Sequence, residues 1–439
     1  MRITFYSLGC RLNEAELERI GQEFTRHGHT IVKNEKDGAD ILILNTCGVT
    51  TEAMRKSRNL ARRLASHHPS LLVILGCAVN LDNNWEIPND IPLLTITNEQ
   101  KADAYKLIEA KCRTLPTMPE RSAPAAATEP AVHPEIREQT HLRSFIKIQD
   151  GCNNACTYCA VHIARGREQS EPSDAILQDI RNCIDDGARE IILTGVQLGA
   201  WREDGNKLPY LLRRIEKETR IERIRLSSIE PWHIDENYWE IWQNPRFCPH
   251  FHIPLQSGCN DILKSMQRRT TVEKYSEIVH NLRTHIKIVR ISTDLIVGFP
   301  GETEEMWQTT MQTLRHLQFE DLHLFRFSAR PGTPAATMPN QINENVKRLR
   351  WAEAHACFHA MQAAQMKSYL GTEHSVLWET PDTDASTPEY NAWNGYTENY
   401  IRVEGHFPKS AYLRNTLSRV RLDGLLEDKM LAAVLPDHP

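Results

Sequence analysis

The sequence predicts an α/β protein with an N-terminal doubly wound α/β domain, a central partial (β/α) barrel and a small C-terminal all-β barrel. Short apolar runs alternate with helical stretches through two regions, the pattern of parallel sheets covered by helices. A stretch rich in Pro, Ala and Glu separates these regions, and near Gly371 the helical period gives way to short strands. At 439 residues the chain is too long for one ordinary core, so several domains are expected.

The N-terminal domain is predicted over residues 1–112. Its elements are expected to be strands at Ile3 to Leu8, Asp40 to Leu44 and Leu71 to Leu75, and helices that begin at Glu14 and Thr50. Residues 113–141, which include LPTMPERSAPAAATEPAVHPE, hold too little apolar bulk to form a core. We therefore interpret them as a linker.

The central barrel is predicted over residues 142–370 and the small all-β domain over residues 371–439. Strands of the barrel are expected at Phe145 to Ile148, Glu190 to Leu193, Arg223 to Leu226, His250 to Ile253 and Val289 to Ile296. Strands of the small domain are expected at Ser375 to Trp378, Tyr400 to Val403 and Thr416 to Val420. Alternation with helices therefore distinguishes the barrel from the C-terminal domain.

Composition points to a cytoplasmic protein without a membrane partner. The first residues, MRITFYSLGC, predict a buried strand rather than a signal peptide, and no later segment is long enough to span a bilayer. The eleven cysteines are better explained by metal ligation or burial than by disulfides, because cytosolic thiols are kept reduced. The net charge of -5 neither favours nor excludes nucleic acid, since a local basic patch decides such binding.

The most informative motif is Cys152-Asn-Asn-Ala-Cys156-Thr-Tyr-Cys159. Three thiolates at these offsets can bind three irons of a four-iron cluster, and the fourth iron then stays open for S-adenosylmethionine. A structural zinc site would more often show two separated C-x-x-C pairs, and no second pair lies nearby. The motif therefore predicts a radical-SAM cluster.

A second set of cysteines, Cys10, Cys47 and Cys77, shares one context, because each follows an apolar strand. The carboxyl ends of parallel strands gather at one edge of a sheet, so these three residues can converge there and hold a second cluster. For any one of them the alternative is a buried, inert thiol. Their equivalent positions favour the cluster.

With these motifs in view, the chain resembles the radical-SAM methylthiotransferases over nearly its whole length. SLGCRLNEAE, LNTCGVTTEAMRKSR and the Gly-Cys pair at Gly76 resemble the family's N-terminal cluster domain, and KIQDGCNNACTYC with ARG at Ala164 resembles its radical-SAM loop. LTGVQLG, RLSSIEP, HIPLQSG, SMQRRTT, TDLIVGFPGETEE and FRFSARPGTPA resemble stretches of its barrel, in this order. The resemblance implies a C-terminal RNA-binding barrel of the TRAM type, and AVNLDNN after Cys77 departs from the family pattern.

The resemblance also implies the chemistry. S-adenosylmethionine would supply a methyl group to sulfur at the second cluster and would then be cleaved to a 5′-deoxyadenosyl radical that removes a substrate hydrogen. Two 4Fe-4S clusters and a low-potential electron donor are implied, and the sulfur donor is not identified by the sequence. Cys152, Cys156 and Cys159 are the expected catalytic ligands.

Polar residues at the predicted strand ends are candidates for binding S-adenosylmethionine. They are Thr194, Gly195, Gln197, Glu230, Gln256, Ser257 and Arg269. A glycine permits close backbone approach, and an arginine or carboxylate there can pair with the charged groups of the ligand. An ordinary strand-to-helix turn, or surface charges, are the alternatives.

The predicted substrate is tRNA with N6-threonylcarbamoyladenosine beside the anticodon, because GYTENYIRV at Gly395 most resembles that branch of the family. Isopentenyladenosine in tRNA, an aspartate of a ribosomal protein, and a non-catalytic RNA-binding iron-sulfur scaffold are the alternatives. The candidate RNA contacts are Arg55, Lys56, Arg58, Arg62, Arg63, Tyr396, Asn399, Tyr400 and Arg402. A solvated helix face and a core tyrosine are the simpler interpretations of these residues.

Overall fold

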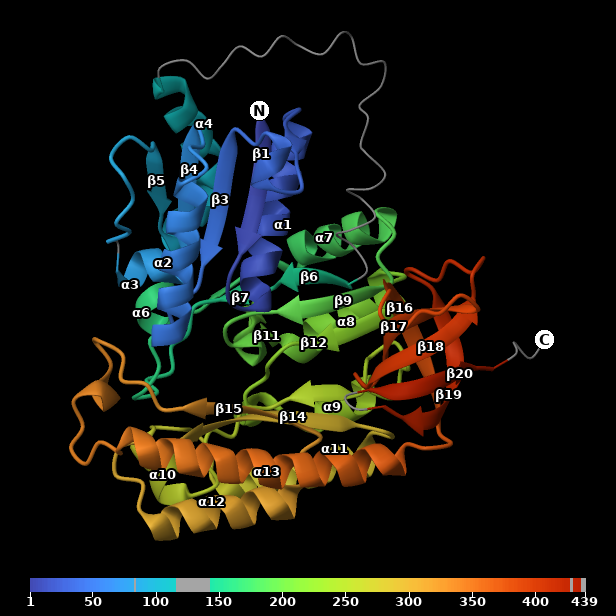
Figure 1. The fold of residues 1–439 in the computed structure, drawn as a ribbon. Helices are drawn as coiled ribbons and strands as arrows, with labels where there is room; N and C mark the ends of the chain where they lie inside the picture. The colour runs from blue at the N-terminus through green and yellow to red at the C-terminus, as the bar shows by residue number, and fades with distance from the viewer. Residues whose placement is uncertain (83, 116–142, 427–428, 436–439) are drawn as a thin grey trace.

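The computed structural model describes residues 1–82, 84–115, 143–426 and 429–435, which form three domains in chain order (Figure 1). Most of the expected linker, 113–141, lies outside the described residues. No helix in the described ranges has both the length and the apolar character needed to cross a bilayer.

Five parallel strands form the N-terminal sheet in the order β2-β1-β3-β4-β5 (Figure 1). Alternate residues of a strand point to opposite faces, so each face has its own core. Ile41 and Ile43 pack with α1 and α4, whereas Leu42 and Leu44 pack with α2 and α3. The elements are β1 (Arg2–Ser7), α1 (Arg11–Arg26), β2 (Thr30–Ile31), β3 (Ile41–Thr46), α2 (Thr51–Ala65), β4 (Leu71–Gly76), α3 (Cys77–Leu81), β5 (Leu93–Ile96) and α4 (Ala104–Thr114). The expected doubly wound domain is confirmed.

Six parallel strands form the central partial barrel in the order β6-β9-β12-β13-β14-β15. Two isolated bridges, Ile224 to Phe247 and Ser228 to His252, connect its two three-stranded halves. The strands are β6 (Arg143–Lys147), β9 (Glu190–Thr194), β12 (Arg223–Leu226), β13 (His250–His252), β14 (Arg290–Val297) and β15 (Asp321–Arg326). In the described residues β6 does not pair with β15, and α1 of the N-terminal domain packs against β6. The expected partial barrel is confirmed.

Helices cover the outer, apolar face of this barrel and bury a single large core. They are α7 (Ser173–Asp185), α8 (Leu208–Glu218), α9 (Glu236–Ile241), α11 (Val272–His285), α12 (Glu304–Leu317) and α13 (Glu344–Ser368). The short helix α6 (Val161–Arg165) contacts α3 of the N-terminal domain, and Ile262 of α10 (Asn260–Ser265) belongs to a separate small core. Short strand pairs β7 (Gln149–Asp150) with β8 (Gln169–Ser170), and β10 (Arg202–Glu203) with β11 (Asn206–Lys207), lie in the connecting loops.

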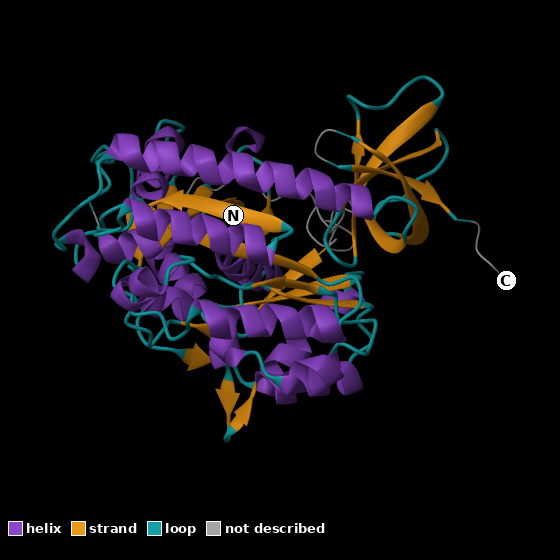
Figure 2. Cartoon of the chain, turned by 90° about the horizontal axis from the view of Figure 1, so that it is seen from below, coloured by secondary structure: helices purple, strands orange, loops and turns teal. Residues whose placement is uncertain are grey.

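The C-terminal domain is a closed barrel of five strands in the order β16-β17-β18-β20-β19, as expected for a small all-β domain. Figure 2 shows it at one end of the molecule, where the long helix α13 leads into it. Its strands are β16 (Glu373–Asp382), β17 (Tyr390–Thr397), β18 (Arg402–Pro408), β19 (Leu417–Leu425) and β20 (Met430–Val434). Trp378 and Trp393 fill its centre.

Candidate cluster sites and active site

Cys10, Cys47 and Cys77 converge at the carboxyl edge of the N-terminal sheet. The strand order reverses between β1 and β3, and ligands of doubly wound folds bind at such a switch point. Cys10 follows β1, Cys47 follows β3, and Cys77 begins the helix after β4. Burial raises the pKa of the Cys47 thiol, and the nearby Cys77 and Cys10 thiols raise that pKa further. A Cβ on Gly9 would lie 2.7 Å from the Cβ of Cys47, and its φ of 123° also favours glycine.

A buried arginine of the barrel, Arg165, reaches this cysteine set. Its Nε donates to the Sγ of Cys77 at 3.1 Å. Its other nitrogens donate to Glu16 Oε1 at 2.9 Å, Asp150 Oδ1 at 3.0 Å and Asn13 Oδ1 at 2.8 Å. Arg165 ends α6, directly after the radical-SAM loop, so one guanidinium connects the two cysteine-bearing regions.

The carboxylate of Glu16 on α1 is the main anion of this network. Burial alone would raise its pKa, but Lys101, Arg165 and Lys147 hold that pKa well below its usual range. Glu16 therefore stays ionised, and the buried cations around it keep a partner.

A second barrel arginine, Arg330, holds the loop that follows Cys47. Its guanidinium donates to the carbonyl oxygen of Gly48 and, at 3.2 Å, to the hydroxyl of Thr51. Arg330 as a whole is 9% exposed, so these contacts are largely shielded from water. The geometry of the N-terminal cysteine loops thus depends on side chains of the barrel.

Cys152, Cys156 and Cys159 lie on the loop between β7 and α6. Backbone N–H groups point at two of their sulfurs, from Asn154 to Cys152 and from Val161 to Cys159, each at 3.4 Å. Hydrogen bonds of this kind tune thiolates that bind iron-sulfur clusters. A cavity of about 290 Å³ borders the loop beside Cys152.

In the described residues, the sulfurs of each cysteine triad lie too far apart to be the ligands of a single zinc ion. Tetrahedral zinc–sulfur bonds of about 2.3 Å would place ligand sulfurs less than about 4 Å apart. In the described part of the chain, the three sulfurs of neither triad all come within 4.8 Å of one another. Burial raises the pKa of Cys159 to about 12 and that of Cys47 to about 11, so these thiols need a bound cation to ionise at neutral pH.

The residues expected at the end of β9 do lie beside the radical-SAM loop. The side-chain oxygen of Gln197 accepts a hydrogen bond from the Sγ of Cys152 at 3.4 Å. Gln149 accepts the backbone N–H of Gln197 at 2.8 Å, and a Cβ on Gly195 would lie 3.0 Å from the same amide oxygen. Thr194 is buried as the last residue of β9. The backbone at Gly195 therefore packs closely against Gln149, and its contact with S-adenosylmethionine stays a prediction.

Glu230 also lies at this end of the barrel, but its cationic partner is Arg268. Arg268 donates to the two carboxylate oxygens of Glu230 at 3.2 and 2.5 Å, and one of its nitrogens lies 3.9 Å from the Sγ of Cys156. The expected arginine, Arg269, is exposed and lies over the ring of Trp232. The two arginines are neighbours on a turn, and only Arg268 points inward.

Gln256 and Ser257 differ from each other in environment. Gln256 has a φ of 74° and its backbone N–H donates to Asp294 O at 2.8 Å. The fully buried Ser257 accepts the backbone N–H of Cys259 and contacts Thr310. Ser257 therefore caps the turn before α10, which is a structural role rather than the expected ligand contact.

The basic side chains of α2 that were expected to contact RNA mostly form ion pairs. The pairs are Arg55 and Lys56 with Glu52, Arg58 with Asp82, and Arg62 with Glu86. Arg63 acts electrostatically on Glu35. Exposed ion pairs stabilise a protein by only about 0–1 kcal/mol, so an RNA phosphate can compete with the carboxylates for these arginines. The RNA contact of α2 stays a prediction.

Three residues expected to contact RNA instead join the small barrel to the central one. Asn399 is fully buried and donates to the carbonyl of Ile288 at 3.1 Å. Tyr400 stacks on Tyr396 with ring centroids 4.8 Å apart, and its ring lies 4.5 Å from the guanidinium carbon of Arg225. These positions disagree with the expected RNA contacts, because the side chains face the barrel. Arg402, which is partly exposed, stays a candidate.

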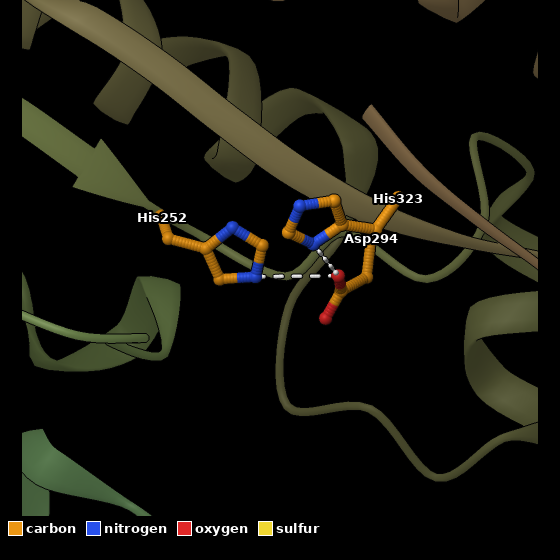
Figure 3. A group of neighbouring side chains, drawn as sticks. All are labelled: His252, Asp294 and His323. Carbon is orange, nitrogen blue, oxygen red and sulfur yellow. Dashed lines mark hydrogen bonds and ion pairs between the residues drawn. The ribbon is translucent and has the colours of Figure 1, made fainter. Parts of the chain in front are cut away.

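Side chains on the inner face of the barrel form a separate polar cluster (Figure 3). His252 Nε2 and His323 Nδ1 each lie 3.2 Å from the same carboxylate oxygen of Asp294. The three ligand atoms lie within 4.8 Å of one another. Burial alone would raise the pKa of Asp294, but His252 and His323 hold that pKa well below its usual range.

Three arginines that contact the cysteine loops were not among the residues expected from the sequence: Arg165, Arg268 and Arg330. Each lies within a stretch matched to the family, ARG, SMQRRTT and FRFSARPGTPA. The motifs were therefore visible, but which side chain in each points inward was not.

Comparisons with known proteins agree with this architecture. A model of the Radical SAM superfamily matches residues 146–314, and one described as Uncharacterized protein family UPF0004 matches residues 2–96. The chain is 33% identical over 413 residues to the threonylcarbamoyladenosine tRNA methylthiotransferase MtaB of Bacillus subtilis, which covers 91% of this chain and 89% of that protein. It is 31% identical to the tRNA-2-methylthio-N(6)-dimethylallyladenosine synthase of Aquifex aeolicus, over 85% of this chain and 87% of that protein.

Among solved structures, the radical S-adenosylmethionine methyltransferase TsrM of Kitasatospora setae is similar in fold. Its complex with tryptophan and a SAM analog matches with a TM-score of 0.57 at 12% identity, over 88% of this chain and 79% of that chain. At this identity the likeness concerns the fold alone.

Proposed function

Because the chain belongs to the radical-SAM tRNA methylthiotransferases, we propose that it converts N6-threonylcarbamoyladenosine in tRNA to its 2-methylthio derivative. The observation that carries the proposal is the connection of two cysteine triads through Arg165, which sits between Cys77 and the radical-SAM loop. An enzyme that only cleaved S-adenosylmethionine would have no use for the second triad. The threonylcarbamoyl substrate is supported by relatives of that name at 31–33% identity.

In this proposal Cys152, Cys156 and Cys159 hold one 4Fe-4S cluster, and Cys10, Cys47 and Cys77 hold the other. When bound, the first cluster supplies the electron that cleaves S-adenosylmethionine reductively. The chain's part is to hold S-adenosylmethionine with polar groups at the strand ends. The candidates are Thr194, Gly195, Gln197, Glu230 and Gln256. Arg268 orients the carboxylate of Glu230 for that role.

We further infer that the protein works in the cytoplasm, where tRNA is modified and thiols stay reduced. A low-potential electron donor and a sulfur donor are required partners. Exposed arginines on α2 are candidates for tRNA phosphates, because they can exchange an acidic partner for a phosphate.

Replacing single cysteines tests the proposal. Cys152→Ala should abolish 5′-deoxyadenosine formation, whereas Cys10→Ala should keep it and lose the methylthio product. Iron should fall from about eight to about four per chain in either variant after anaerobic reconstitution. Cys357→Ala, on α13 and outside both triads, is the matched control.

The assay uses anticodon stem-loop RNA and mass spectrometry of its nucleosides. Product on the isopentenyladenosine RNA but not on the threonylcarbamoyladenosine RNA would replace the proposed substrate with that of the dimethylallyladenosine relatives. If the wild type carries both clusters but forms no 5′-deoxyadenosine, the enzymatic proposal fails and the protein is a non-catalytic iron-sulfur scaffold.

A further inference from the structure

The inner face of the barrel along β13, β14 and β15 is polar, whereas the outer face is apolar. Successive side chains of a strand alternate between the faces. Phe251, Ile291, Leu295 and Leu322 belong to the hydrophobic core under the helices. The inward positions between them carry His250, His252, Ser292, Asp294 and His323. A barrel stabilised by packing alone would carry branched apolar residues on its inner face, so this polar lining needs another explanation.

Part of this lining is open to a ligand. The side chain of His323 is 53% exposed, while Asp294 is 19% exposed and holds both histidines through one oxygen. Figure 3 shows the second carboxylate oxygen of Asp294 pointing away from both rings. It has no hydrogen bond to the described residues. Hydrogen bonds between His252 and Ser292 at 2.9 Å and between Ser292 and His250 at 3.3 Å support the cluster on the side away from Asp294.

A cation from the N-terminal domain faces the same region. Arg11, the first residue of α1, donates to the hydroxyl of Tyr400 at 2.8 Å, and the ring of Tyr400 lies 4.9 Å from the ring of His250. Arg11 directly follows Cys10, so the polar lining is adjacent to the triad where sulfur would be added.

An aromatic side chain completes the surface. Phe325 is two residues beyond His323 on β15, on the same face, and is 44% exposed. An exposed aromatic ring at this position can stack on a nucleobase, because every nucleobase has a flat π-face.

Together these side chains match a threonylcarbamoyl group on the adenosine and do not match an isopentenyl group. A threonylcarbamoyl group carries a carboxylate, a hydroxyl and urea N–H groups, whereas an isopentenyl group carries no polar atom. A site built to hydrogen-bond a substituent rejects an analogue that lacks the polar groups, because its own groups are left unpaired.

We propose that Arg11 and His323 bind the carboxylate of the threonylcarbamoyl group, that Asp294 accepts its N–H or hydroxyl, and that Phe325 stacks on the adenine. This assignment rests on the proposed function, and it identifies the residues that select the substrate.

The test measures binding of three anticodon stem-loop RNAs that differ only at the target adenosine: threonylcarbamoyl, its methyl ester, and unmodified. Fluorescence anisotropy gives Kd for the full-length, cluster-loaded enzyme. The wild type should bind the acid about tenfold or more tighter than the ester, since a charge-assisted hydrogen bond is lost. Arg11→Gln and His323→Gln should each bring the ratio towards one by weakening binding of the acid alone.

Controls separate recognition from folding. Arg348→Gln and His359→Gln, exposed positions on α13, should keep the wild-type ratio. Iron content and 5′-deoxyadenosine formation without RNA should match the wild type in His323→Gln. Arg11→Lys, which keeps the charge, should retain part of the ratio.

An acid-to-ester ratio unchanged in both variants would overturn the assignment. Stoichiometric zinc that is present in the wild type and lost in His323→Gln, with an unchanged ratio, would overturn it in favour of a metal site at this cluster. If the wild type loads its clusters but makes no methylthio product on the threonylcarbamoyl RNA, the proposed function fails. A normal product with unchanged ratios defeats only the recognition assignment.

Discussion

Single arginines decide the geometry around both cysteine triads. Arg165 satisfies three anionic or polar partners besides Cys77, and it does so with a planar fork of donors that lysine lacks. Its guanidinium is buried, so its charge acts on the sulfur with little screening. Arg268 likewise donates to the carboxylate of Glu230 and places its charge beside the sulfur of Cys156.

Glu190 at the start of β9 gives a pH-dependent contribution to stability. The carboxylate is fully buried, and although burial raises its pKa, Arg225 and Arg223 lower the pKa to about 2. A folded-state pKa below the unfolded value stabilises the protein above the ordinary glutamate range, and this stabilisation is lost as pH falls towards about 2.

We expect Glu190→Gln to be destabilised by about 3 kcal/mol at neutral pH, because two buried arginines lose their anion. The difference from wild type should shrink as pH falls from about 4.5 to about 2. Urea unfolding across this range measures it. Glu240→Gln, at an exposed pair, is the control, and a difference independent of pH would contradict the assigned pKa.

The turn between β17 and β18 joins two domains. Thr397 and Asn399 hydrogen-bond within the turn, and Arg290 of the barrel donates to the carbonyl of Tyr400 at 2.5 Å. Tyr400 has a φ of 72°, a conformation that costs a non-glycine residue about 1–3 kcal/mol and persists only when surrounding contacts hold it. The turn is therefore a docking element whose conformation depends on the central barrel.

We expect Tyr400→Ala to loosen this docking. The variant loses the ring contacts with Tyr396 and Arg225 and the hydrogen bonds from Arg11 and Arg143. Amide hydrogen exchange in β17 and β18 should quicken, by about tenfold or more for a loss of at least about 1.4 kcal/mol.

Tyr400→Phe keeps the ring and should show a smaller effect. Tyr412→Ala, at a ring that is 64% exposed, is the control. Equal exchange in Tyr400→Ala and the wild type would show that the turn does not hold the domains together.

Across the whole molecule, the N-terminal cysteine loops are completed by the barrel. Arg165 reaches Cys77, and Arg330 reaches the loop after Cys47, so both arginines cross from the central domain. Asn98 of the N-terminal domain donates in return to the carbonyl of Ala164 at 2.6 Å. The second cluster site is thus a property of the assembled domains.

Arg330→Ala should therefore weaken the second cluster while sparing the first. Reconstituted iron should fall from about eight towards about four per chain, and 5′-deoxyadenosine formation should persist. Arg348→Ala on the exposed face of α13 is the control. Full iron loading in Arg330→Ala would show that the Cys47 loop holds its shape without the barrel.

The sequence by itself determined the order of the three domains, the partial barrel and both cysteine triads. These follow from local patterns, since strand periodicity and the spacing of Cys152, Cys156 and Cys159 need no distant partner. Only the tertiary structure decided that Arg268 rather than Arg269 meets Glu230, that Asn399 and Tyr400 dock a domain, and that His252, Asp294 and His323 share one inner face. Those outcomes depend on which side chains from distant strands meet, and that is set by packing and chain crossing rather than by any local pattern.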